Sequence, residues 1–278
     1  MRRIVRTAMT LAMAGAALFG AGTVASAAPT PHATVNFTGI VALDDCSGSL
    51  VRTPGSAATD PALVLTNGHC IETGFLQPGQ VIVNQASTRQ FDLLDPSGND
   101  LATLQANDVL YSTMTDTDIT LYRLNTTYQQ IQQRYGATPL TLATQPDPVN
   151  TAIKVVSGYW QKIYSCNING YAYEVQENGW TWQNSIRYTK ACNVIGGTSG
   201  SPVIDPATDQ IVGINNTINE DGQRCTLDNP CEIDQNGNVT IHKGIGYAEE
   251  TYLLDTCLDT GNVLDLNRSD CTLPKPAS

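Results

Sequence analysis

Short apolar runs, each bounded by turn-forming residues, recur along most of the chain. The continuous run at residues 62–66 is typical of a buried strand, and residues 119–124 alternate apolar and polar positions as a half-buried strand does. Residues 162–166, 171–176 and 185–189 predict three short strands, with turns at Asn169-Gly170 and Asn178-Gly179. Further strand-like runs lie at residues 37–43, 46–51, 81–83, 101–111, 153–158, 210–214, 239–241 and 244–248.

Helical periodicity is rare by comparison. Residues 249–258 are the only good helix candidate, and residues 128–135 would make one or two helical turns. Many short strands with so little helix predict an all-β barrel or sandwich. Pro139, Pro146 and Pro148 mark a long connection near residues 136–150, which we expect to join two halves of the fold.

The first residues are typical of a secretory signal peptide. Arg2, Arg3 and Arg6 form a basic start, an apolar run follows, and residues 25–27 are a small-x-small cleavage site. We therefore assign residues 1–27 to a signal peptide, 28–36 to a flexible lead-in or short pro-segment, and 37–278 to the folded domain. The apolar run is short for a bilayer span and no later run is longer, so we expect a secreted, soluble mature protein.

Charge and cysteine content narrow the classes of partner and cofactor. Without the three arginines of the signal peptide, the chain has 12 basic and 26 acidic residues, a formal charge of −14. Such a surface disfavours polyanions, so we expect neither nucleic acid nor a membrane as a partner. The eight cysteines predict four disulfides in an exported chain. Zinc would need clustered Cys and His, and with three histidines and no C-x-x-C we expect no metal and no other cofactor.

The first candidate catalytic site lies at residues 192–202, with the sequence C-N-V-I-G-G-T-S-G-S-P. Three glycines surround Ser199, and glycine lets a backbone take positive φ and approach a ligand closely. Such a loop can expose a serine hydroxyl and aim backbone N–H groups at one point, as a nucleophile and its oxyanion hole require. The same residue types also make ordinary surface turns.

An imidazole base for this serine could come from His32, His69 or His242. His32 lies in the lead-in, and His242 lies beside Lys243 in a strand-like run. His69 directly follows the buried strand at residues 62–66, which places it at the end of a rigid element. A lone histidine at a strand end more often has a structural role than a catalytic one. The choice between the two roles for His69 therefore depends on the surrounding sequence.

Four sequence blocks resemble those of chymotrypsin-like (trypsin-like) serine proteases, in their secreted bacterial branch. Residues 46–50 are similar to the C-G-G-S-L block, 65–70 to T-A-A-H-C, 118–121 to D-I-A-L and 197–202 to G-D-S-G-S/G-P. The blocks follow in the order His, Asp, Ser and cover most of residues 37–258. The resemblance implies two six-stranded antiparallel β-barrels with the active site in the cleft between them, and we add a short C-terminal helix.

The resemblance also implies a role for each matching residue. Ser199 would be the nucleophile and His69 the base that takes its proton. Asp118 would orient the imidazole, with Asp116 as the alternative orienting carboxylate. The N–H groups of Gly197 and Ser199 would form the oxyanion hole.

Disulfide pairing is partly implied by the same resemblance. A family bridge that ties the His-bearing loop to the neighbouring strand matches Cys46 with Cys70. We expect the other pairs to be Cys166–Cys192, Cys225–Cys231 and Cys257–Cys271. Cys192 with Cys225 is an open alternative, because the family often bridges the two walls of its specificity pocket.

Two departures from the family pattern affect function. Thr198 stands where trypsin-like zymogens have the aspartate that receives a freed N-terminal amine, so we expect no such salt bridge. The position of the pocket acid in trypsin falls on Asn193, with Asn216 and Thr217 on the opposite wall. We therefore expect a polar pocket without a strict preference for Arg or Lys.

These observations predict a secreted, monomeric serine endopeptidase that cleaves protein or peptide substrates through an acyl-enzyme. Two alternatives stay open. One is a catalytically inactive homologue that acts as a binding module, and the other is an esterase that uses the same triad.

Overall fold

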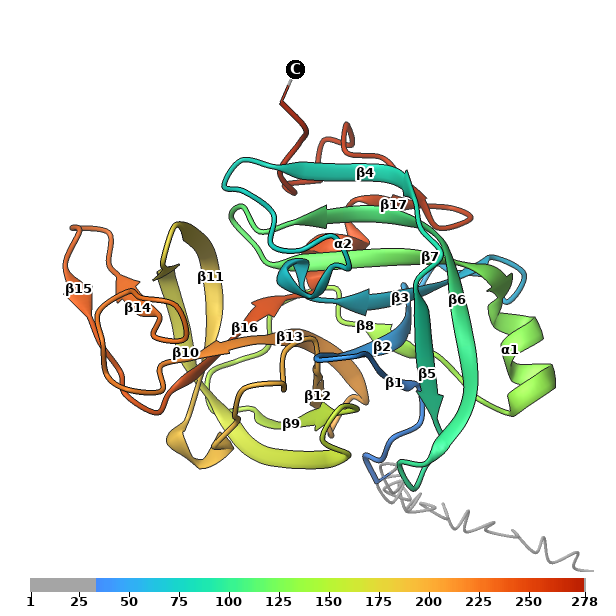
Figure 1. Cartoon of the computed structure of the whole chain (residues 1–278), viewed down its shortest axis with the longest axis horizontal. Coiled ribbons are helices and arrows are strands. Elements are labelled where there is room, and N and C mark those ends of the chain that lie inside the picture. Colours follow the sequence, from blue (N-terminus) through green and yellow to red (C-terminus); the bar gives the residue numbers. More distant parts are fainter. Residues whose placement is uncertain (1–33, 278) are drawn as a thin grey trace, which may run out of the picture. The chain divides into compact units, whose positions relative to one another are not determined.

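The computed structural model describes residues 34–277. The expected signal peptide, His32 and most of the expected lead-in lie outside the described residues. Strands dominate the described part (Figure 1), which confirms the all-β prediction. None of the described helices is long and apolar enough to cross a membrane.

Six antiparallel strands close a first ring in the order β1–β5–β6–β7–β3–β2, because β1 pairs with both β5 and β2. A further strand, β4, pairs with β6. The bounds are β1 (Ile40–Ala42), β2 (Ser47–Arg52), β3 (Pro61–Thr66), β4 (Val81–Ala86), β5 (Gln90–Leu94), β6 (Asp100–Thr113) and β7 (Ile119–Thr127).

A second ring of six antiparallel strands closes in the order β9–β10–β11–β16–β13–β12, because β13 pairs with both β12 and β16. Its bounds are β9 (Ala152–Ser157), β10 (Lys162–Glu177), β11 (Trp180–Tyr188), β12 (Pro202–Asp205), β13 (Gln210–Ile218) and β16 (Gly246–Glu250). A small hairpin of β14 (Cys231–Ile233) and β15 (Val239–Thr240) pairs with β10. The two rings confirm the predicted pair of six-stranded barrels.

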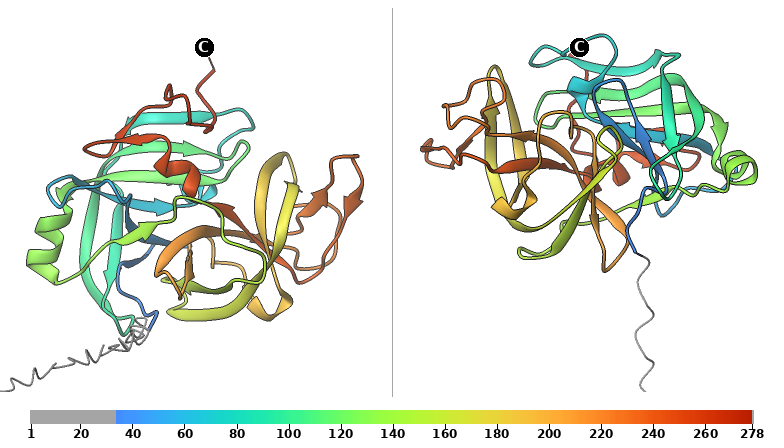
Figure 2. Two further views of the ribbon diagram at one scale, coloured as in Figure 1. Left: turned by 180° about the vertical axis from the view of Figure 1, so that it is seen from behind. Right: turned by 60° about the horizontal axis from the view of Figure 1, so that its bottom comes forward.

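One short strand links the two rings. β8 (Leu140–Leu142) pairs in parallel with β2 of the first ring and with β13 of the second. It follows helix α1 (Tyr128–Tyr135), which begins with a capping box at Thr127 and ends at Gly136 in the left-handed conformation. In the views of Figures 1 and 2, α1 lies on the side of the first ring that faces away from the second.

Strand β3 illustrates how an apolar run becomes a central strand. Ala62 and Val64 belong to one buried cluster, whereas Leu63 and Leu65 belong to another, which includes residues of the C-terminal segment. A strand buried on both faces needs apolar residues at consecutive positions. The C-terminal segment contains helix α2 (Tyr252–Asp255) and the strand pair β17 (Leu258–Asp259) and β18 (Val263–Leu264).

The C-terminal helix is shorter than the sequence predicts. Of the expected residues 249–258, only α2 is helical, and the prediction is wrong for Glu249 and Glu250, which are the last residues of β16. Both pair with β13, and the ladder hydrogen bonds and burial of that pairing outweigh the local helical pattern.

The turn expected at Asn169-Gly170 is also absent, because β10 continues through these residues. β9 pairs with β10 up to Asn167, and β11 pairs with it from Ile168 onward, with a bulge in the register between Ile168 and Gly170. A Cβ at Gly170 would lie 2.8 Å from Nη2 of Arg187, so the glycine makes room for that side chain. The Asn-Gly pair therefore bends a strand here instead of reversing it. The turn at Asn178-Gly179 does connect β10 with β11.

Candidate active site

His69 lies in a short 3₁₀ turn, η1 (Gly68–Cys70), directly after β3. A Cβ at Gly68 would lie 2.1 Å from the carbonyl oxygen of Thr113 and 2.7 Å from Oδ1 of Asp118, so only glycine lets the turn approach this closely. The His69 backbone N–H donates to Asp118 Oδ1 at 2.9 Å, and its ring Nδ1 lies 2.7 Å from Asp118 Oδ2.

Asp118 is the carboxylate that faces the imidazole. It directly precedes β7 and is completely buried, whereas 19% of the His69 side chain is exposed. Burial disfavours the charged imidazolium, but the charge and hydrogen bond of Asp118, together with the more distant carboxylates Glu177 and Asp45, outweigh this effect and raise the pKa of His69. Asn67 supports the same residue, because its Nδ2 donates to the Asp118 carbonyl at 2.8 Å.

The loop that carries Ser199 follows a second 3₁₀ turn, η2 (Lys190–Cys192), and ends at β12. Residues 195–198 form a β-turn closed by a 3.1 Å hydrogen bond from the Thr198 N–H to the Ile195 carbonyl. Gly197, the third residue of the turn, has φ +80°, as a type II turn requires. Gly200 has φ +76°, and a Cβ there would lie 2.0 Å from the carbonyl oxygen of Ser47.

Ser199 is partly exposed and lines the same pocket as His69. Its hydroxyl donates to the Asn216 carbonyl at 3.2 Å, and its own carbonyl accepts the Ser47 N–H at 2.7 Å. Among the hydrogen bonds of residues 34–277, none has the N–H of Gly197 or Ser199 as its donor. Both N–H groups therefore remain available for an oxygen of a ligand.

His69, Asp118 and Ser199 line a single pocket together with Asn216 and Thr217. Asn193, predicted on the facing wall, is exposed and lies outside this pocket. The structure therefore brings together the three residues of the predicted triad and one of the two predicted pocket walls.

Residues 46–214 match the trypsin-like peptidase domain family. The match covers more than half of the chain and includes His69, Asp118 and Ser199. The chain belongs to this family.

Solved structures that match this chain include bacterial proteases at low sequence identity. The MamO protease domain from Magnetospirillum magneticum is 13% identical, with a TM-score of 0.49 over 80% of this chain and 97% of that one. The Cellulomonas bogoriensis chymotrypsin is 14% identical, with a TM-score of 0.41 over 78% and 90%. The active form of the M. tuberculosis protease Rv3671c is 13% identical, with a TM-score of 0.47 over 86% and 82%. A search of curated proteins returned no match.

Two aromatic side chains, Phe75 and Trp180, pack beside the imidazole in this peptidase domain. The ring of Phe75 packs edge-on against His69, with centroids 5.9 Å apart, and against Trp180, with centroids 5.6 Å apart. Trp180 Nε1 donates to the Leu76 carbonyl at 2.8 Å. The β10–β11 hairpin is thereby attached to the segment that follows His69.

Two buried acids, Glu177 and Glu249, lie close to the triad. Glu177 lines the pocket and accepts hydrogen bonds from the Thr217 hydroxyl and the Asp228 N–H. Burial raises its pKa to about 7. Burial also raises the pKa of Glu249 to about 8, and the Asp118 carboxylate adds to the effect. Glu249 accepts from Asn216 Nδ2 at 3.0 Å and from the Ser185 hydroxyl at 3.1 Å.

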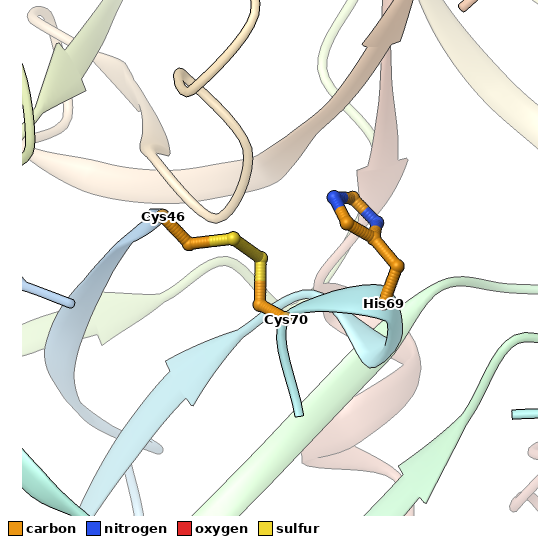
Figure 3. Close-up of side chains that lie close together, drawn as sticks. All are labelled: Cys46, His69 and Cys70. Carbon is orange, nitrogen blue, oxygen red and sulfur yellow. A yellow bond between two sulfur atoms is a disulfide. The ribbon is translucent and has the colours of Figure 1, made fainter. Parts of the chain in front are cut away.

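Cys46, His69 and Cys70 form a group whose side-chain donor atoms lie within 4.8 Å of one another (Figure 3). The two sulfur atoms are bonded to each other, so neither is a thiolate that could bind a metal ion. The chemistry of this donor set is that of a disulfide beside a histidine. The bridge ties η1, which carries His69, to the residue that precedes β2.

The other six cysteines of the chain are also paired. Cys192 is bonded to Cys166, so the alternative bridge from Cys192 to Cys225 does not form. The remaining bridges are Cys225–Cys231 and Cys257–Cys271.

Four residues near the site are missing from the sequence-based set of candidates. Asn67 replaces an alanine of the family block, and this departure is a signal that could have drawn attention to it. Besides its bond to Asp118, the Asn67 Oδ1 accepts the N–H of Gly200 in the nucleophile loop. Trp160, Glu177 and Glu249 carry no such signal, because only the folded chain brings them to the site.

Proposed function

We propose that the chain is an exported serine endopeptidase that hydrolyses peptide bonds through Ser199, His69 and Asp118. The observation that carries the proposal is the 2.7 Å contact of His69 Nδ1 with the buried Asp118, in the pocket that also contains the Ser199 hydroxyl. A base held by a carboxylate beside a serine is the arrangement that activates a hydroxyl for acyl transfer.

The first half of the reaction forms the acyl-enzyme. The Ser199 hydroxyl rotates from the Asn216 carbonyl toward His69 Nε2 and loses its proton to it, while Oγ attacks the carbonyl carbon of the substrate. The carbonyl oxygen becomes an oxyanion, which accepts the N–H groups of Gly197 and Ser199. The C–N bond then breaks as the imidazolium returns its proton to the leaving amine.

The second half repeats this chemistry with water. His69 takes a proton from the water, whose oxygen attacks the ester carbon. The second tetrahedral intermediate collapses to a free carboxyl group, and Ser199 Oγ recovers its proton from His69. The nucleophile, the base and the oxyanion donors all come from the chain itself.

Export and substrate class belong to the same proposal. The four disulfides support an oxidising compartment, as does the predicted signal peptide. Asn216 and Thr217, together with the apolar residues Phe75 and Ile195 of the pocket, support a peptide as the ligand. We further propose that the mature protein acts as a monomer.

Fluorophosphonate labelling of the secreted protein, followed by peptide mass spectrometry, tests the proposal. The reagent requires an activated serine, so we expect an adduct on Ser199 and none in the Ser199→Ala variant. A protein that stays unlabelled, also after limited proteolysis within residues 28–36, would be the inactive homologue. Turnover of casein against turnover of simple esters then separates an endopeptidase from an esterase.

A further inference from the structure

Trp160 is a large aromatic residue with 47% of its surface exposed, in the turn between β9 and β10. Its indole Nε1–H donates to the carbonyl oxygen of Gly196 at 2.9 Å. The ring of Tyr159 packs edge-on against the indole, with centroids 4.9 Å apart. An exposed indole therefore has a defined partner in the nucleophile loop.

Hydrogen bonds connect the turn that carries Trp160 to Ser47, the first residue of β2, which also bonds to Ser199. The Tyr159 N–H donates to Ser47 Oγ and the Trp160 N–H donates to Ser157 Oγ, both at 3.2 Å. The Ser47 N–H donates to the Ser199 carbonyl. The indole and the nucleophile are consequently positioned from the same residue, Ser47.

The Gly196–Gly197 peptide that receives the indole hydrogen bond is the central peptide of the type II turn. Type I and type II turns differ mainly by a flip of this peptide, while the bond that closes the turn is kept. Because a trans peptide is planar, its C=O and N–H point to opposite sides. A flip would thus turn the Gly197 N–H away from the side on which the type II turn presents it.

The local sequence leaves this choice open, because both central residues of the turn are glycine and glycine adopts either sign of φ. A contact from outside the turn has to select the orientation. In the type II orientation, the Gly196 carbonyl accepts a hydrogen bond from the indole N–H of Trp160.

We propose that Trp160 is a positioning residue that holds the Gly196–Gly197 peptide in the orientation that offers the Gly197 N–H to the oxyanion. The inference rests on the proposed serine-protease function and adds a residue that lies outside the pocket lined by the triad. Close packing agrees with it. A Cβ at Gly197 would lie 3.0 Å from Trp160 Nε1 and 3.2 Å from the Tyr159 ring.

The Trp160→Phe variant tests the inference, because it keeps an aromatic ring for Tyr159 and removes the N–H donor. We expect kcat to fall about tenfold with KM unchanged, within the ceiling of ~10²–10³ for loss of a whole oxyanion donor. The inhibition constant of a peptide aldehyde, whose adduct carries an oxyanion, should rise by a similar factor. Tyr159→Phe is the matched control, and it should leave all three quantities unchanged.

Unchanged kcat and aldehyde affinity in Trp160→Phe would overturn the inference. A raised KM with normal kcat would overturn it as well, because Trp160 would then be a substrate contact. A wild-type protein without fluorophosphonate labelling would instead count against the proposed function.

An NMR measurement tests the positioning role without any turnover. In a type II turn the Hα atoms of Gly196 lie close to the amide proton of Gly197, and a flip to type I separates them. We expect this nuclear Overhauser effect to be strong in the wild type and in Tyr159→Phe and weaker in Trp160→Phe. Equal intensity in all three proteins would show that the indole does not select the turn.

Discussion

Asp116 and Asp118 are two residues apart, but their carboxyl groups have different surroundings. Asp118 is buried and contacts both the backbone N–H and the ring of His69. Asp116 is exposed, has φ +59°, and its backbone bonds to Thr181 and Gln183 of β11. The geometry therefore favours Asp118 as the orienting carboxylate.

Asp118→Asn should lower kcat by about 10⁴-fold, because the amide neither holds the reactive tautomer of the imidazole nor stabilises its cation. Steady-state kinetics of the purified variant measure this. Asp116→Asn is the matched control, since asparagine tolerates positive φ, and its kcat should stay near that of the wild type. If Asp116→Asn lowered kcat and Asp118→Asn did not, Asp116 would be the orienting carboxylate.

Glu177→Gln should move the acid limb of the pH profile of kcat/KM to lower pH. Burial lowers the pKa of His69, whereas the Asp118 carboxylate raises it. The Glu177 carboxylate adds to the increase. Glu177, whose own pKa is about 7, carries part of a negative charge where His69 titrates. Removing that partial charge lowers the pKa of His69, so the neutral, reactive imidazole persists to lower pH. Glu174→Gln removes a charge from the same strand outside the pocket, and its acid limb should not move.

At the level of elements, Asn67 joins three segments that are far apart in sequence. It follows β3 directly, donates to the Asp118 carbonyl before β7, and accepts the N–H of Gly200 before β12. Its side chain is completely buried. The Asn67 amide is therefore one of the contacts that fix the position of the nucleophile loop relative to the imidazole.

Asn67→Ala should lower both kcat and the free energy of unfolding, the latter by roughly 1–3 kcal/mol, because the buried Asp118 carbonyl loses this donor and the Gly200 N–H keeps only the Asn215 carbonyl. Denaturant titration and kinetics on the same sample measure the two effects. Asn262→Ala is the control, because Asn262 is also buried but bonds to Pro61, Tyr128 and Ser56, away from the pocket. It should lose at least as much stability with kcat unchanged.

At the level of the whole molecule, several buried carboxyl groups give stability a particular pH dependence. Burial raises the pKa of Glu249 to about 8 and that of Glu177 and Glu250 to about 7. In the unfolded chain these groups lose their protons near pH 4.3. Between these values the folded state binds more protons than the unfolded state, so stability falls as the pH rises. His69, whose pKa is also raised, acts in the same direction.

The free energy of unfolding should therefore decrease from about pH 5 to pH 8, which urea titrations at a series of pH values can follow. Glu249→Gln keeps an oxygen for Asn216 and Ser185 but cannot ionise. It should flatten the curve and, at pH 8, recover on the order of 3–5 kcal/mol. Curves for the two proteins that run parallel over this range would contradict the prediction.

Local patterns in the sequence were enough for most of the strands and the all-β class, whereas the family resemblance supplied the two-barrel architecture and the order of the candidate residues. The run at residues 62–66 predicts β3 because a strand buried on both faces needs consecutive apolar residues, and Asn178-Gly179 predicts the β10–β11 turn through its backbone preferences. The positive φ of Gly197 and Gly200 could be expected in the same way, since it is a property that glycine permits at single positions.

Contacts between residues that are distant in sequence depend on how the chain packs. Gly196 contacts Trp160 from 36 residues away, and Gly200 contacts Asn67 from 133 residues away. The run at residues 249–258 has a helical pattern, but the pairing of Glu249 and Glu250 with β13 makes them a strand. Burial, hydrogen-bond partners and charge proximity depend on packing between distant segments. For that reason the orientation of the oxyanion turn and the raised pKa values of Glu177 and Glu249 became visible only in the folded chain.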